Sequence, residues 1–170
     1  MLLLYSFPSS AYFIDFLKIQ YAGEIGKISV GIGKNMNSFY SIEYFHGITF
    51  EDESGVEVET LALKNNFKFL SIEKFGYHTS LYAGVAIYHA TGLRYQSSRH
   101  STYPDQYYRM GSVRGLFYLG FDIKLSKMKK HLGYFESGIN DIVLTNYLNN
   151  PDVINPKDYV SLALGYGYLF

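Results

Sequence analysis

The sequence predicts an all-β protein, a single eight-stranded antiparallel up-and-down transmembrane β-barrel. Hydrophobic residues alternate with polar or small ones along runs of roughly ten residues, the length that a tilted strand needs to cross a bilayer. No helix-period apolar stripe persists, and no apolar run reaches the about 18 residues of a membrane-spanning helix. The 170 residues include 18 Tyr, 13 Phe and 16 Gly but only 4 Pro. This composition favours strands with amphipathic rings at a boundary between apolar and aqueous surroundings.

Charge and cysteine content exclude several other classes of protein. Fifteen basic and fifteen acidic residues cancel, so the chain lacks the basic excess of a general nucleic-acid binder, and no nucleic-acid partner is expected. There is no cysteine for a disulfide or a cysteine-rich metal site. His46, His78 and His131 have no second ligand at metal spacing. We therefore expect neither a metal nor a cofactor.

The first residues resemble the apolar end of a secretory signal. Residues 1–11 are apolar, with the small residues Ser9 and Ala11 where a signal peptidase would cleave, but they lack the usual basic start. The alternative is an apolar first strand. We expect a truncated signal at 1–11 and one barrel domain at 12–170.

Each predicted strand is an alternating run between turn-forming residues. In the seventh, Glu136, Asn140 and Asp141 do not fall on one face, which predicts a β-bulge. The fourth and fifth form a hairpin with a tight turn near Glu73. The eight predicted strands span residues 14–22, 27–34, 39–49, 56–70, 77–90, 109–125, 131–145 and 159–170.

The two faces of these strands decide between a soluble and a membrane barrel. One face is broadly aliphatic and aromatic, and lipid can cover it, because a closed barrel leaves no unpaired strand edge in hydrocarbon. The other face can fill the narrow lumen of an eight-stranded barrel. The inverse arrangement, a lipocalin-like soluble barrel, remains the alternative. The second face mixes Gly, Ser and Thr with the charged residues Lys18, Glu43, Lys64, Arg114, Asp122 and Lys124.

The last strand ends in a glycine and two aromatic residues, Gly165, Tyr168 and Phe170. This pattern resembles the C-terminal signal of bacterial outer-membrane barrels. The resemblance implies a Gram-negative outer-membrane location, both termini in the periplasm and recognition by the barrel assembly machinery during insertion. Glycine would let the strand bend, and the alternating rings would join the periplasmic aromatic girdle.

The longest predicted outer loop, 91–108, and the start of the next strand carry basic residues among tyrosines. Guanidinium groups at the outer rim suit bidentate contact with the phosphates of lipopolysaccharide. The alternative is a solvated loop that folds over the barrel mouth. The candidate contact residues are Arg94, Arg99, His100 and Arg109.

A hydrolytic site on the outer wall is a second possibility. A hairpin centred on Glu73 places Glu57 opposite His89, with Thr91 on the same face. A carboxylate, an imidazole and a hydroxyl are the groups of nucleophilic ester hydrolysis. The arrangement resembles the lipid A 3-O-deacylases, which carry a His-x-Ser-Asn motif before the final hairpin. Residues 143–146 read Val-Leu-Thr-Asn there and lack its histidine. An interfacial histidine satisfied by its neighbours is the alternative.

Three functions follow from these observations. The leading hypothesis is a non-enzymatic outer-membrane barrel with a structural, adhesive or surface-interaction role through its outer loops. The first alternative is a barrel-wall lipid A acyl-ester hydrolase that uses His89, Glu57 and Thr91. The second is a conduit or binder for a small apolar ligand, which a lumen filled by Arg114, Asp122 and Glu136 would exclude.

Overall fold

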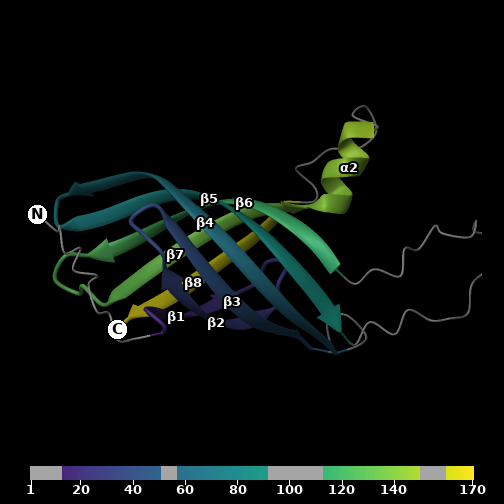
Figure 1. The fold of residues 1–170 in the computed structure, drawn as a ribbon, viewed down its shortest axis with the longest axis horizontal. Coiled ribbons are helices and arrows are strands. Elements are labelled where there is room, and N and C mark those ends of the chain that lie inside the picture. The colour runs from purple at the N-terminus through teal and green to yellow at the C-terminus, as the bar shows by residue number, and fades with distance from the viewer. Residues whose placement is uncertain (1–12, 51–56, 92–112, 150–159) are drawn as a thin grey trace, which may run out of the picture.

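Eight antiparallel strands close into a barrel in chain order in the computed structural model, which describes residues 13–50, 57–91, 113–149 and 160–170 (Figure 1). Within these residues one helix, α2 (Asp141–Asn149), follows the seventh strand, and no described helix is long and apolar enough to cross a membrane. The predicted fold class and the count of eight strands are confirmed. The strands are β1 (Phe16–Tyr21), β2 (Ile28–Asn35), β3 (Tyr40–Thr49), β4 (Val58–Lys74), β5 (Tyr77–Thr91), β6 (Val113–Leu125), β7 (His131–Asn140) and β8 (Ser161–Leu169).

The barrel has two different ends. The turns after β2, β4 and β6 lie at one of them, here called the short-turn end. The described chain also begins and ends there, because the Phe170 N–H donates to the Asp15 carbonyl at 3.0 Å. We call the opposite end, where β1 turns into β2 and α2 leaves the wall, the loop end (Figure 1).

Alternation along the strands separates an apolar exterior from a polar interior. Charged outward positions occur only near the barrel ends of the described strands, with Glu59 at the loop end and Lys34 and Lys74 at the short-turn end. Between them the outward side chains are exposed and mostly apolar. They include Leu17, Ile19, Tyr21, Val30, Ile32, Tyr44, Leu63, Phe67, Val85, Ile87, Phe117, Leu119, Ile123, Leu162, Leu164 and Tyr166.

Inward-facing glycines provide the space for the rings that fill the lumen. Gly84 pairs directly with Tyr118 across β5 and β6, and a Cβ on Gly84 would lie 2.1 Å from that ring. Gly120 pairs with Tyr82 in the same ladder, and its Cβ would lie 2.5 Å from that ring. A glycine opposite an aromatic residue thus lets the ring lie flat over the neighbouring strand, which fills the barrel without widening it.

The last third of the predicted seventh strand, residues 141–145, is wrong. Strand β7 ends at Asn140, and the helix α2 begins at Asp141. The Asn140 side chain caps this helix, because its Oδ1 accepts a hydrogen bond from the Val143 N–H at 3.0 Å. The predicted bulge is also absent from this strand, since the described ladders of β7 with β6 and β8 run without a shift in register.

The β4–β5 hairpin is longer than predicted and carries the bulge instead. Strand β4 continues to Lys74, and the turn falls at Phe75–Gly76 rather than near Glu73. The register shifts between Lys68 and Leu70, so one extra residue enters β4 there. The displaced turn moves β4 along β5, and the extra residue offsets one position of that movement, so every pair of the hairpin differs from the predicted pairing.

Candidate functional site

A buried ion pair occupies the middle of the lumen. Lys64 is 0% exposed, and its Nζ lies 2.5 and 2.7 Å from the two carboxylate oxygens of Glu136. The Tyr82 hydroxyl donates to the same carboxylate at 3.0 Å, and Gln20 Oε1 accepts from Lys64 at 3.4 Å. Each charge therefore has several partners, as burial of an ion pair requires.

Aromatic rings close the remaining space around this pair. The Lys64 ammonium lies 4.8 Å from the ring centre of Phe45 and 4.7 Å from that of Tyr118. The Tyr118 hydroxyl donates to Asn66 at 2.6 Å. Charge, ring and amide thus form one continuous layer across the barrel, and both the glycines beneath the rings and the ionic contacts hold it in place.

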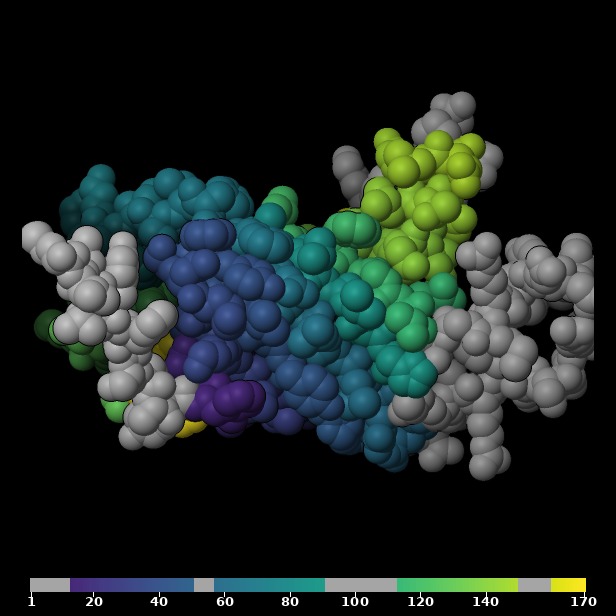
Figure 2. All heavy atoms as spheres, viewed as in Figure 1, coloured from purple at the N-terminus to yellow at the C-terminus, as the bar shows by residue number. Residues whose placement is uncertain are grey.

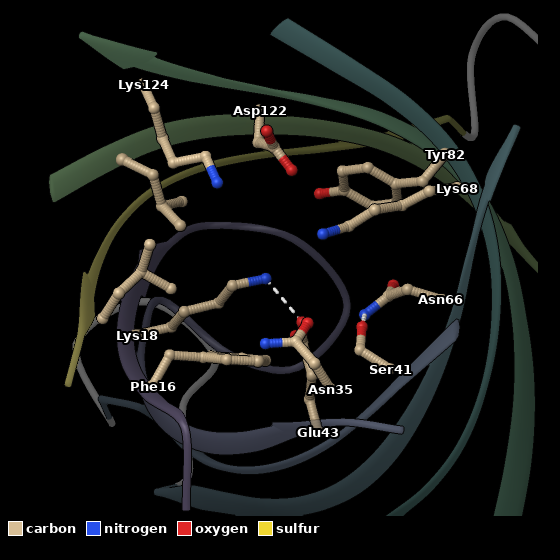
Figure 3. Close-up of a pocket in the computed structure, with 12 residues that line it drawn as sticks. Phe16, Lys18, Asn35, Ser41, Glu43, Asn66, Lys68, Tyr82, Asp122 and Lys124 are labelled. Carbon is tan, nitrogen blue, oxygen red and sulfur yellow. Dashed lines mark hydrogen bonds and ion pairs between the residues drawn. The ribbon is translucent and has the colours of Figure 1, made fainter. Parts of the chain in front are cut away.

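A cavity of about 120 Å³ lies between this layer and the short-turn end (Figure 3). Lys18 and Glu43 form an ion pair of 2.5 Å on its wall. The side chains of Lys68, Asp122 and Lys124 also point into the cavity, and Asp122 lies between the two lysines in Figure 3. The volume admits a few water molecules. It is far below the size of ordinary small-molecule pockets, about 300–1,000 Å³.

The polar groups of this cavity are not fully satisfied by one another. Glu43 Oε2 and Asp122 Oδ1 are buried oxygens that accept no hydrogen bond from the described residues. Lys68 and Lys124 form no ion pair within the described parts of the chain. Water is the chemically suited occupant, since it can donate to the carboxylates and accept from the ammonium groups.

No described passage joins the two ends of the lumen. On the loop-end side of the Lys64–Glu136 layer there is a separate cavity of only about 10 Å³, which is lined by Gln20, Glu24 and Tyr118 among others. One water molecule is the most it can hold. The predicted lumen residues Asp122 and Glu136 are both buried inside the barrel, and Arg114 on β6 is half-buried.

The predicted hydrolytic constellation does not assemble in the observed register. His89 lies on the outward set of β5, as expected, but Leu61 is its partner on β4. The backbone of Thr91 pairs with Glu59. Glu57 precedes Val58, the first residue of β4, and so lies beyond the level of His89, toward the loop end. The predicted Glu57–His89 pairing is therefore wrong, because the displaced turn and the bulge change the register of β4 against β5.

The register of β3 against β4 brings together a different pair, which the sequence did not single out. His46 and His89 both pair with Leu61 from opposite sides, and His46 Nε2 lies 3.8 Å from Glu59 Oε2 on the outer wall. The pair is about half exposed, with side chains at 42% and 53%. Its separation is longer than a hydrogen bond. Identifying this pair requires the register of β3 against β4, which sequence patterns do not determine.

The C-terminal strand has a packing role that the motif did not indicate. Gly165 pairs with Tyr134, and a Cβ on this glycine would lie 2.1 Å from the tyrosine ring, so the glycine provides space rather than a bend. Tyr168 and Phe170 form an edge-to-face pair with centres 5.8 Å apart. His131 packs on Tyr168 at 5.3 Å and hydrogen-bonds the hydroxyl of Tyr166. Recognition of this strand by an assembly machinery stays a prediction.

Several predicted features lie outside the described residues. They are the candidate lipopolysaccharide contacts Arg94, Arg99, His100 and Arg109 and the expected signal at 1–11. These features stay predictions.

The fold and its filled lumen define a closed eight-stranded up-and-down barrel with an apolar exterior, and known structures share this fold. The N-terminal β-barrel domain of Pseudomonas aeruginosa OprF matches 91% of this chain and 96% of its own, with 11% identity and a TM-score of 0.50. The outer membrane enzyme PagL matches 92% of this chain and 99% of its own, with 12% identity and a TM-score of 0.51. No family model matches the sequence. No curated protein matches it either. At these identities the likeness concerns the fold alone.

Proposed function

We propose that this protein is an integral barrel of the bacterial outer membrane, with a structural, adhesive or surface-interaction role exerted through its loop end. The observation that carries the proposal is the inverted distribution of side chains. Ionised groups such as Lys64 and Glu136 fill the interior, whereas the exterior between the two barrel ends is mostly apolar. A water-soluble barrel has the opposite arrangement.

The exposure of large apolar side chains around the wall supports this assignment. A soluble monomer rarely exposes a contiguous apolar patch above a few hundred Å². Here outward side chains as large as Leu119, 62% exposed, and Ile87, also 62% exposed, occur on neighbouring strands around the wall. Lipid around the wall removes the free-energy cost of exposing these apolar side chains to water. The closed ladder of strands pairs the backbone N–H and C=O groups, as hydrocarbon surroundings require. The lipocalin-like alternative lacks support for the same reason.

The filled lumen favours a scaffold over a conduit. The Lys64–Glu136 layer separates a cavity of about 120 Å³ from one of about 10 Å³, so neither leads across the barrel. We expect the refolded protein to produce no discrete current steps in planar bilayers. A double substitution that removes two rings of the layer, Phe45→Ala with Tyr118→Ala, is the matched control, since it is expected to open the middle of the lumen. Stable unitary currents from the unsubstituted protein would revive the conduit.

Two measurements test the location and the orientation. In a density gradient of cell envelopes the protein should sediment with the outer membrane. Trypsin added to intact cells should cut in 92–112, after Arg94, Arg99 or Arg109, and should leave Lys127 and Lys129 of the short-turn end intact until the envelope is permeabilised. Recovery in a soluble fraction would contradict the proposal. Cleavage at Lys127 in intact cells would reverse the orientation.

A catalytic role has a separate test. Because Leu61 rather than Glu57 lies opposite His89, the geometry gives the hydrolase alternative no support beyond the fold. We expect lipid A from cells with and without the protein to show the same acyl pattern by mass spectrometry. Loss of one acyl chain, dependent on His89 or on His46, would overturn the non-enzymatic assignment.

A further inference from the structure

Helix α2 leaves two apolar side chains exposed, Ile142 and Leu148, whereas Val143, Leu144 and Tyr147 are half-buried. No residue of the helix is buried, and Leu148 is 70% exposed. With about 3.6 residues per turn, most of its apolar residues fall on one side. Val143, Leu144, Tyr147 and Leu148 fall on one side, and Thr145, Asn146 and Asn149 fall on the other, together with Ile142. No charged residue follows Asp141 in the helix.

A helix of this length needs a surface to pack on. Isolated helices shorter than about 12–15 residues are marginal in water, and α2 has nine. It contacts β6 and β7 beside its first turn. There, a Cβ placed on Gly115 would lie 3.6 Å from the Asp141 Cβ. From there the helix stands away from the barrel wall, as the ribbon and the space-filling drawing show from the same direction (Figures 1 and 2).

Hydrogen bonds fix the direction in which α2 leaves the wall. The Asn140 Oδ1 caps the helix, and the Asn140 Nδ2 donates to Glu24 Oε1 at 3.3 Å. The other oxygen of Glu24 accepts from the Tyr88 hydroxyl at 3.3 Å. The cap is thus tied to two other parts of the barrel, and the helix runs sideways, roughly across the long axis of the barrel (Figure 1).

The helix leaves the wall at a level where the exterior is still apolar. Asn140 pairs with Leu116, and β6 continues beyond that pair to Val113, which points outward and is 59% exposed. Outward residues of the adjacent β8, such as Leu162, are equally apolar and exposed. A helix that leaves sideways at this level therefore enters the same environment that the outward side chains of β6 and β8 face.

We propose that α2 is an interfacial anchor, which lies in the headgroup region of the surrounding lipid with the face of Leu144 and Leu148 toward the acyl chains. This inference rests on the proposed membrane location. Interfacial helices bury their apolar face about 5–10 Å into the boundary between headgroups and chains. The absence of charge after Asp141 suits this depth. The anchor would fix the rotation and depth of the barrel near its loop end.

Single tryptophans can report the position of the helix, because the chain contains no tryptophan of its own. The full-length protein carrying Leu148→Trp would be refolded into phosphatidylcholine vesicles with bromine atoms either near the headgroups or at the ends of the acyl chains. Bromine quenches an indole that it contacts. Three further variants calibrate the result. Asn146→Trp lies on the opposite side of α2, Leu119→Trp in the middle of the outer wall, and Met128→Trp in a turn at the short-turn end.

We expect bromines near the headgroups to quench Leu148→Trp strongly, and Asn146→Trp much less. Leu119→Trp should lose most fluorescence with bromines deep in the chains, and Met128→Trp should lose little with either lipid. Equal quenching at 146 and 148, or none at 148 while Leu119→Trp is quenched, would overturn the anchor and leave the membrane location standing. No quenching of Leu119→Trp would overturn both. If Leu148→Trp does not fold, Tyr147→Trp tests the same face.

Discussion

The Lys64–Glu136 pair shows most directly how single residues hold this barrel together. Removal of one partner leaves an uncompensated buried charge, which typically costs 3–5 kcal/mol. We therefore expect Lys64→Met and Glu136→Gln each to lower the free energy of unfolding in urea by about 3–5 kcal/mol. The double variant should lose far less than the sum, because it removes both charges together.

The outer-wall pair His46–Glu59 is the matched control for this cycle. It also joins a basic side chain to a carboxylate, but the side chains are half-exposed and the separation is 3.8 Å. Exposed pairs couple by roughly 0–1 kcal/mol. Coupling at Lys64–Glu136 no larger than at His46–Glu59 would contradict the role assigned to the buried pair.

Glycine provides a second residue-scale test. Gly84→Ala places a Cβ 2.1 Å from the Tyr118 ring, so the ring must move within a filled lumen. Overpacking of this kind costs about 1–3 kcal/mol, and we expect the urea midpoint to fall accordingly. Gly133→Ala meets nothing within 4 Å and should leave the midpoint unchanged or slightly raised. An equal effect of both substitutions would show that the ring contact is unimportant.

The hairpin β4–β5 carries the clearest element-scale prediction. Phe75 and Gly76 form its turn with φ of 54° and 79°, and the Phe75 side chain is 87% exposed. A left-handed conformation costs most residues roughly 1–2 kcal/mol, and asparagine tolerates it better. Phe75→Asn should therefore raise the free energy of unfolding by up to about 1 kcal/mol.

Phe13→Asn is the control for this substitution. Phe13 is also 87% exposed, and it also has a lysine ammonium near its ring, at 5.9 Å against 5.0 Å for Phe75. It is not among the residues with positive φ. A gain in stability from Phe13→Asn as large as that from Phe75→Asn would mean that the backbone conformation is not the cause.

Strands and helices were predictable from the sequence where a single hydrophobic periodicity is present. They were not predictable where a strand-like pattern and a helix cap occur in the same segment. The alternation of Phe117, Leu119 and Phe121 with inward Tyr118 and Gly120 is unambiguous, and β6 is confirmed. Residues 141–145 also contain closely spaced apolar side chains, but there the cap from Asn140 favours a helix. A cap of this kind depends on the rotamer of one side chain, so the alternation of apolar and polar residues alone does not predict it.

Register was the second feature that the sequence did not determine. The turn lies two to three residues beyond its expected place, and the extra residue between Lys68 and Leu70 offsets part of that displacement, so Leu61 replaces Glu57 opposite His89. Together the two changes shift the pairing by an even number of residues, which keeps the same side chains inward and outward, so the hydrophobic pattern fits either alignment. This explains why the fold was predicted and the outer-wall pairing was not.

At the scale of the whole molecule, the apolar exterior should behave as a surface adapted to lipid. Leu119 lies midway along β6, points outward and is 62% exposed, whereas Val113 lies at the loop end of the same strand. An arginine on the lipid face costs about 2–4 kcal/mol at the bilayer midplane and about 0–1 kcal/mol near the interface. We expect Leu119→Arg to lower the free energy of unfolding from vesicles by the larger amount and Val113→Arg by the smaller.

The comparison between the two arginine variants separates a lipid-facing wall from other causes of instability. Both substitutions remove an exposed apolar side chain from the same strand and add the same charge, so strand propensity and net charge cancel between them. Only the depth in the bilayer differs. If the wall faced water, both arginines would be nearly neutral. If it faced a protein partner instead, Leu119→Arg would destabilise the assembly but not the refolded barrel in vesicles. A cost that decreases from the middle of β6 toward its end is the result that a membrane alone produces, because only the bilayer imposes a gradient of polarity along the barrel axis.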